Sequence, residues 1–355
     1  MLVVTLNQDS HDFSTLSRNL ADFSVEWRIV SVHDEREVLS AIVDGGAEVV
    51  VAGIDGGRGP ALFGLLRLAH PQVIRLLLMG EGGSSLPLNA LESAHRLLHR
   101  PLQAEELIEA VDSIYELHEL LDNEALKATV GQVTSLSAPP KLFAEITRTM
   151  LDPECSASQV ADLIGQDPAI AAKVLRLCNS AYYSGGRQVT DLRGAVIRLG
   201  LETVRRLVLL TEVFTGGNGA DREAIRERAL RSSQLAARLL AGSSAELAAT
   251  ASLLSEVGRL LPGVSEDGQD GPHYAEAGAY LLGLWGLPMP IVEAVAYHPQ
   301  PQRSRTRGFW VSGAVHVARA LAANESVDEG YLASVSMMDK LPGWRKLADE
   351  MGALS

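Results

Sequence analysis

Residues 47–52 have the sequence Ala-Glu-Val-Val-Val-Ala, a short run with three consecutive valines at its centre. Valine favours strands, and a continuous apolar run indicates a strand that is buried on both faces. A second run of this kind covers residues 73–79, and shorter runs lie at 2–6, 25–30 and 95–98. Strands of this type are typical of parallel sheets, so the sequence predicts five parallel strands in its first third.

Helix-like segments separate these runs. Leu62 and Leu66 repeat at helical spacing after Pro60, a residue that commonly opens helices, and Gly45-Gly46 ends the helix before it. Strands that alternate with helices predict an α/β domain built as a doubly wound, flavodoxin-like parallel sheet. In such folds the functional crevice lies at the carboxyl ends of the strands.

A longer helix is predicted to connect this domain to the rest of the chain, over residues 104–130. Its apolar positions are spaced like a heptad seam, which either packs on the sheet of its own domain or joins two domains or two protomers. The seam consists of Leu107, Val111, Ile114, His118, Leu121 and Ala125.

Beyond Gly131 the strand signals vanish, and one helix is expected to follow another. Ser158, Asp167 and Asp191 are predicted to cap helices, and Gly200 is predicted to end one. The sequence therefore predicts a multidomain chain in which an all-α part follows the α/β part. Further helices are expected over 225–240, 244–261, 274–285, 291–297 and 309–322.

Composition limits the range of partners. The chain has 355 residues, with 31 Lys and Arg against 44 Asp and Glu, which gives a net charge of -13. Such a surface repels phosphate backbones and anionic lipids, so we expect neither a nucleic-acid partner nor a membrane. The two cysteines, Cys155 and Cys178, form no zinc-binding pattern, and no apolar run or charged leader indicates a span or a signal peptide. We expect a cytoplasmic protein with reduced thiols.

The strand order and the pair Arg100-Pro101 resemble a response-regulator receiver domain, over residues 1–116. This resemblance implies an acidic cluster that holds Mg²⁺, an aspartate that accepts a phosphoryl group, and a hydroxyl and a lysine that contact the phosphate. In this sequence those positions fall on Asn7, Gln8, Asp9, Gly53, Met79 and Arg100.

Glycine at the acceptor position cannot form an acyl phosphate, because Gly53 has no side chain. We therefore interpret this part as a pseudo-receiver, which keeps the fold and loses phosphotransfer. Asp55 remains an alternative acceptor, and its glycine-rich loop over residues 53–60 remains a weak candidate phosphate cradle.

The second part, residues 131–355, resembles an HDOD domain, an all-helical output module related to HD phosphohydrolases. The phrases that carry this resemblance lie at 166–183, 195–200, 273–282, 285–288 and 296–298. In HD enzymes, His and Asp side chains from several helices hold one or two metal ions that activate water.

The resemblance places Ser255 and Glu256 at the His-Asp dyad of HD enzymes and Ser232 at an upstream histidine. Arg319 falls near a late aspartate, where a cation replaces an anion. We therefore expect no metal, no cofactor and no catalytic residue. His273 and His298 match the family pattern and are either vestigial ligands or packing residues, and with Glu256 they remain a candidate Zn²⁺ set.

These features predict a non-catalytic adaptor of bacterial signal transduction, related to two-component systems. It would bind other signalling proteins without control by phosphorylation, and the receiver face or the connecting helix could support a homodimer. Two alternatives stay open: a weak metal-dependent phosphohydrolase of nucleotides or cyclic dinucleotides, and a sensor that binds a nucleotide without hydrolysing it.

Overall fold

The structure is a computed structural model, which forms two compact units. The first unit holds residues up to 134, together with 179–187 and 284–286, and the second unit holds the rest. The boundaries 1–116, 104–130 and 131–355 that the sequence suggests stay predictions. The structure describes residues 2–6, 28–53, 58–78, 94–98, 104–131, 146, 149, 155–179, 188–201, 204 and 219–352.

The first unit contains a five-stranded sheet in the order β2-β1-β3-β4-β5, in which every pair of neighbours is parallel. This is the doubly wound, flavodoxin-like order, which confirms the predicted α/β class. The central strands β3 and β4 are almost completely buried, as their apolar runs predict. The strands are β1 (Leu2–Leu6), β2 (Arg28–Val32), β3 (Val49–Gly53), β4 (Ile74–Leu78) and β5 (Arg96–Leu98).

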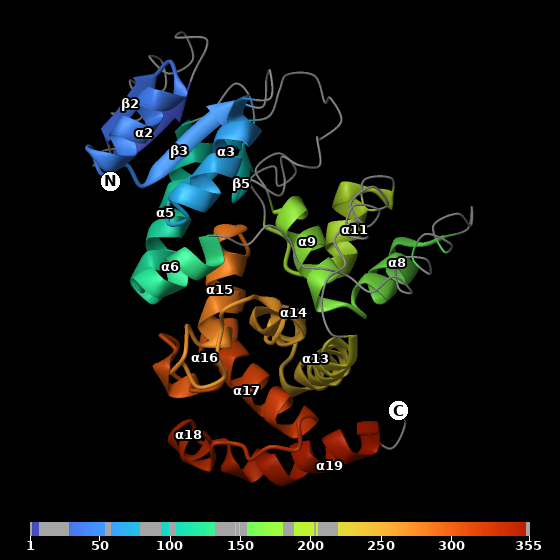
Figure 1. Cartoon of the computed structure of the whole chain (residues 1–355). Coiled ribbons are helices and arrows are strands. Elements are labelled where there is room, and N and C mark those ends of the chain that lie inside the picture. The colour runs from blue at the N-terminus through green and yellow to red at the C-terminus, as the bar shows by residue number, and fades with distance from the viewer. Residues whose placement is uncertain are drawn as a thin grey trace. The chain divides into compact units, whose positions relative to one another are not determined.

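Two helices that follow strands of this sheet are labelled α2 and α3 in Figure 1. Local contacts fix where each of them begins. Helix α2 (Glu35–Val43) begins after Asp34, whose carboxylate accepts hydrogen bonds from two backbone amides of the first turn. Helix α3 (Arg58–Ala69) begins two residues before the predicted start at Pro60. A Cβ atom on Gly59 would lie 2.2 Å from the carbonyl oxygen of Gly53, so only glycine allows α3 to start this close to β3.

The predicted connecting helix is two helices, so the expectation of one helix over residues 104–130 is wrong. Helix α5 (Ala104–Leu120) ends, and α6 (Glu124–Gly131) begins after Asn123, whose side chain accepts hydrogen bonds from the amides of Ala125 and Leu126. The heptad seam is therefore interrupted, because an Asn cap restarts the helix inside it.

The end of α6 is bound to the sheet by a buried arginine. Arg75 of β4 donates a hydrogen bond of 2.9 Å to the carbonyl oxygen of Gly131. A Cβ atom on Gly131 would lie 1.9 Å from the carbonyl oxygen of Pro71, so this close approach requires glycine. The connector therefore folds onto the first unit at both of its helices, since α5 also buries one face.

The described part of the second unit is helical, apart from an isolated bridge between Ser265 and His273. This confirms the all-α class. Its elements are α8 (Ala157–Ile164), α9 (Pro168–Cys178), α11 (Leu192–Leu199), α13 (Gly219–Leu239), α14 (Ser243–Leu254), η2 (Val257–Leu260), α15 (Tyr274–Leu284), α16 (Met289–Tyr297), η3 (Pro301–Arg303), α17 (Val311–Ala322), α18 (Glu329–Ser334), η4 (Met338–Lys340) and α19 (Leu341–Gly352).

Helix caps follow the sequence with one exception. Asp167 and Asp191 accept hydrogen bonds from the first turns of α9 and α11, as predicted. The predicted cap at Ser158 is wrong, because α8 begins after Ser156. There Ser156 and Gln159 form a reciprocal capping box, in which each side chain accepts a hydrogen bond from the other residue's amide.

The single helix predicted over residues 244–261 breaks after Leu254. Ser255 and Glu256 lie between α14 and the short helix η2. A Cβ atom on Gly258 would lie 1.9 Å from the carbonyl oxygen of Tyr274, so the break lets the chain approach α15 very closely. The residues at the predicted dyad therefore sit at a change of helical geometry.

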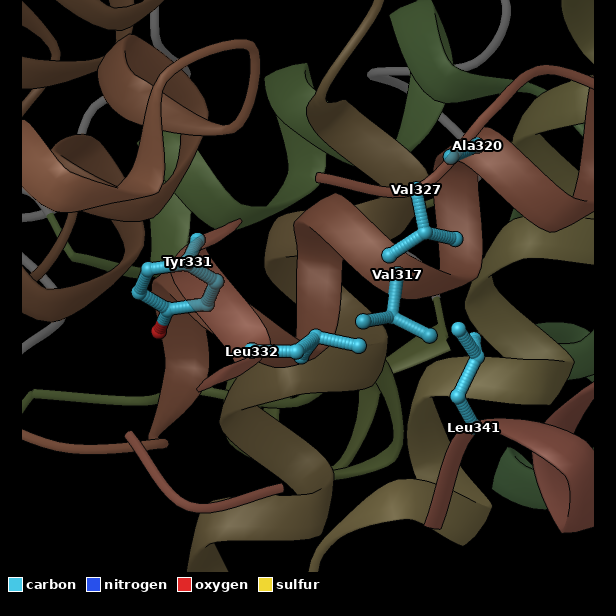
Figure 2. Close-up of a cluster of buried hydrophobic side chains, with 6 residues drawn as sticks. All are labelled: Val317, Ala320, Val327, Tyr331, Leu332 and Leu341. Atoms are coloured by element: carbon cyan, nitrogen blue, oxygen red, sulfur yellow. The ribbon is translucent and has the colours of Figure 1, made fainter. Parts of the chain in front are cut away.

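A buried apolar cluster fixes the C-terminal helices, which the sequence analysis did not predict. Figure 2 shows side chains from α17, α18 and the start of α19 gathered around Val317. Leu332 and Val317 are fully buried in it. The cluster holds one side of α17, the helix that carries Arg319. Its buried members are Val317, Ala320, Val327, Tyr331, Leu332 and Leu341.

Candidate functional site

Glu256 is a buried carboxylate that three arginines surround, and its side chain is only 1% exposed. Arg228 lies against it with two nitrogens, Nη2 at 2.9 Å and Nε at 3.0 Å from Oε2. The Nε atom of Arg319 donates to Oε1 at 3.3 Å, and Nε of Arg259 lies 3.5 Å from the same oxygen. Three positive charges therefore converge on one buried negative charge.

These arginines come from three elements: Arg228 from α13, Arg259 from η2 and Arg319 from α17. The sequence analysis noted Arg319 and missed the other two. Their spacing could have revealed them, because Arg228 precedes Ser232 by one helical turn and Arg259 follows Glu256 by three residues. Burial disfavours the charged form of Arg319, but Tyr274 and the nearby carboxylates outweigh burial and raise its pKa.

A second contact links Tyr274 of α15 to His298, which ends α16. The tyrosine hydroxyl lies 3.1 Å from Nε2 of His298, and Nδ1 of the same ring lies 2.8 Å from the carbonyl oxygen of Val295. The carbonyl fixes the tautomer: Nδ1 donates to Val295, and Nε2 accepts from the hydroxyl. Burial lowers the pKa of His298 to about 3, so this ring is neutral at pH 7.

The guanidinium group of Arg259 connects the two contacts, because its carbon lies 3.9 Å from the centre of the Tyr274 ring. This is a cation–π contact in a partly buried setting. Burial also raises the pKa of Tyr274, so its hydroxyl keeps its proton and donates to His298. Glu256, Arg259, Tyr274 and His298 thus form one continuous polar network.

The other histidines of this region have structural contacts. Nδ1 of His316 donates to the carbonyl oxygen of His298 at 2.7 Å, and its Nε2 accepts from the amide of Asp328 at 2.9 Å. His273 stacks on Tyr274 with ring centres 4.8 Å apart, and its Nδ1 accepts from the amide of Ala275. Within the described ranges, no hydrogen bond or ion pair links His273 to Glu256, and the two residues are not part of a group that could hold a metal ion.

The two predicted serines lie in a separate polar contact. The hydroxyl groups of Ser232 and Ser252 are 2.5 Å apart, and Ser255 donates to the carbonyl oxygen of Ser252 at 2.8 Å. All three are almost completely buried. Ser232 therefore faces inward from α13, where it pairs with α14.

The residues at the dyad position do not fit the metal ions that the HD relationship implies. Both oxygens of Glu256 already accept from or contact guanidinium groups, and Nε2 of His298 accepts from Tyr274. A divalent cation here would meet three arginines, whose positive charges repel it. Within the described ranges, no three His, Cys, Asp or Glu side chains lie close enough to hold a metal ion.

The receiver-like edge of the sheet is only partly described. Gly53 ends β3, at the carboxyl edge of the sheet. An open pocket of about 300 Å³ lies near this edge, and its lining includes Leu6 of β1 and the exposed side chains of Arg36 and Arg58. The other predicted residues, Asn7, Gln8, Asp9, Met79 and Arg100, lie outside the described ranges, as does the alternative acceptor Asp55.

A family comparison covers the dyad region. Residues 136–264 match the family model of the HDOD domain. The chain contains an HDOD domain. The match includes Ser232, Ser255 and Glu256 and ends before His273, so Arg319 lies beyond it. The parallel sheet that precedes the HDOD domain fits a receiver-like fold.

A curated relative is an uncharacterized protein from Treponema pallidum (strain Nichols). It is 26% identical over 189 residues, which cover 45% of this chain and 36% of the relative. The matched stretch thus spans about a third of the length of this relative.

Solved structures that are similar to part of this chain include the MmoQ response regulator from Methylococcus capsulatus (21% identical, 59% of this chain and 98% of that chain, TM-score 0.46). A virulence factor from Campylobacter jejuni is 16% identical and matches 62% of this chain and 89% of its own, with a TM-score of 0.48. A proposed phosphohydrolase from Shewanella amazonensis is 25% identical and matches 66% of this chain and 95% of its own, with a TM-score of 0.32. None of the helices in the described ranges combines the length and apolar character of a membrane span.

Proposed function

We propose that this protein is a non-catalytic adaptor in bacterial signal transduction, in which the HDOD domain and the receiver-like domain act by binding other proteins. The observation that supports the proposal is the set of contacts that the carboxylate of Glu256 makes. Three guanidinium groups occupy the surroundings of this carboxylate, where an HD enzyme needs a metal ion and activated water.

The receiver-like domain supports the same conclusion. Its acceptor position falls on Gly53, which offers no carboxylate to a phosphoryl donor. Partners would then recognise the surface of this domain in its unphosphorylated form at all times. A pseudo-receiver of this kind would act independently of phosphorylation, either as a docking face or as a homodimer contact.

Two assays test the adaptor proposal. The full chain is incubated with Mg²⁺ or Mn²⁺ and a panel of nucleotides and cyclic dinucleotides, and we expect no product above the background without protein. In parallel, labelled acetyl phosphate is expected to leave the chain unlabelled. Turnover that EDTA abolishes, or a label on Asp55, would overturn the proposal and favour the phosphohydrolase or a working receiver.

Partner binding needs a positive test as well. The full chain carrying an affinity tag is recovered from its native host, and captured proteins are identified by mass spectrometry with and without EDTA. We expect a defined signalling partner that stays bound in EDTA. Recovery of the bare chain under crosslinking conditions would count against an adaptor.

A further inference from the structure

We propose that the arginines around Glu256 form a binding site for a phosphate group, carried by inorganic phosphate or by a nucleotide. This inference goes beyond the adaptor function and does not depend on it. In this account, Arg228, Arg259 and Arg319 take over the electrostatic task of the metal ions in HD enzymes: they supply fixed positive charge to an oxyanion.

The charge at the centre of the cluster is unbalanced. One carboxylate, 1% exposed, faces three arginine side chains that are 26%, 17% and 16% exposed for Arg228, Arg259 and Arg319 respectively. Their other carboxylate partners, Glu266 and Glu325, are 64% and 51% exposed, where water screens a charge strongly. Counted with these exposed partners the arginines are balanced, but Glu256 alone of the three carboxylates is buried with them. The buried side of the cluster therefore holds more positive than negative charge, which a bound anion would reduce.

The arginines also retain donors that the protein does not use. Within the described ranges, Nη1 of Arg228 and Nη2 of Arg319 have no hydrogen-bond or ion-pair partner. The Nε atom of Arg259 is buried without a hydrogen bond, since its 3.5 Å separation from Glu256 is too long for one. A buried donor such as Nε of Arg259 is costly unless a ligand satisfies it.

The cluster is held in place by its surroundings, as a binding site requires. Glu256 orients Arg228 through two nitrogens, and the Tyr274 ring supports Arg259 from one side. The apolar cluster around Val317 packs against one side of α17 (Figure 2). Arg319 lies on the same helix, so this packing helps to hold it in place. Because these contacts exist before a ligand arrives, little ordering of the arginines would oppose binding.

The experiment is calorimetric titration of the full chain with inorganic phosphate, pyrophosphate, ATP and GTP at constant ionic strength, with sodium chloride as the blank. We expect saturable binding of at least one phosphate compound, and its rank among the probes identifies the source of the phosphate group. Arg319→Gln and Arg228→Gln should each weaken that binding by about tenfold or more, as expected for the loss of a charge-assisted contact.

Arg345→Gln is the matched control, because Arg345 also pairs with a glutamate, Glu329, at an exposed site away from the cluster. It should leave the affinity unchanged. Hydrogen exchange of the unmodified chain provides a second measurement that needs no variant. Phosphate should protect the amides around Arg228, Arg259 and Arg319 and not those of α19.

The outcomes separate clearly. Binding that the control variant weakens as much as Arg319→Gln, or the absence of saturable binding and of protection with every probe, would overturn the site. Neither result bears on partner capture or on hydrolysis, so a failure here leaves the adaptor proposal standing.

Discussion

Arg75 in the sheet unit and Glu256 in the helical unit are both only 1% exposed, yet they are stabilised in opposite ways. Arg75 donates to the carbonyl oxygens of Val73 and Gly131, and its Nη2 lies 2.8 Å from the ring of His95. Glu256 faces three full positive charges. The difference shows that buried charges can have two roles. Arg75 links β4 to the end of α6, whereas the cluster around Glu256 brings several charges together at one place.

The largest expected effect is on the helical unit. Glu256→Ala removes the buried partner that three arginines share and leaves Arg259 and Arg319 with their exposed partners, Glu266 and Glu325. We expect the free energy of unfolding to fall by about 3 kcal/mol, at the low end for a buried pair because the arginines are partly exposed. Urea unfolding measures this change. A loss no larger than that of an exposed ion pair would mean that the cluster is solvated and that the comparison with Arg75 fails.

Acid provides the next test, through His298. Burial lowers its pKa to about 3 in the folded state, below the usual value of 6.5. As pH falls, the imidazole of His298 therefore takes up a proton in the unfolded chain before it does so in the folded chain. The contribution of neutral His298 to stability is fully present above pH 6.5 and is lost as pH falls below that value. From pH 6.5 to pH 5 the loss should be about 2 kcal/mol, one pKa unit being worth about 1.4 kcal/mol.

Urea unfolding between pH 5 and 7.5 measures how the free energy of unfolding falls in acid. His298→Gln should make this fall smaller, because Gln cannot be protonated. Burial also lowers the pKa of His273 and His316, so a shallower slope of the same sign should remain. A variant with an unchanged slope would show that His298 is not the group that titrates.

Arg75→Lys tests the other side of the comparison. Lysine keeps the positive charge and loses the planar fork that reaches Val73, His95 and Gly131 together. We expect a loss of about 1.5 kcal/mol from broken buried hydrogen bonds. Hydrogen exchange should show faster exchange in α6 than in the helical unit. Equal effects in both units would contradict a local clamp.

The smallest effect is expected for Glu266→Gln. Glu266 pairs with Arg259, the same arginine that contacts Glu256, but its side chain is 64% exposed. An exposed pair is worth about 0.5 kcal/mol or less, so unfolding should hardly change. A loss close to that of Glu256→Ala would remove the distinction between the buried and the exposed partner of one arginine.

The sequence predicts the buried strands and several helix starts, but it does not predict where two of the long helices break. The valine run at 47–52 and the apolar run at 73–79 specify buried strands, because both faces must be apolar in a parallel sheet. Asp167 and Asp191 mark helix starts by local hydrogen bonds. The breaks after Leu120 and Leu254 depend on a local cap and on a close approach to α15, which helical periodicity does not encode.

The site was predictable only in part. Glu256 and Arg319 stood out because each replaces a residue type that metal binding needs. Their direct contact depends on the packing of α17 against the preceding helices, which links residues 63 positions apart. Arg228 and Arg259 could have been predicted from their spacing. Arg228 lies one helical turn before Ser232, and Arg259 lies three residues after Glu256.

The most direct measurement is the metal content of the full chain, purified without chelator and then dialysed against Mn²⁺ or Zn²⁺. Elemental mass spectrometry should find far less than one metal ion per chain, with no change after Glu256→Gln, because arginines supply the positive charge of this HDOD domain. One equivalent of metal that is lost in Glu256→Gln would contradict the account.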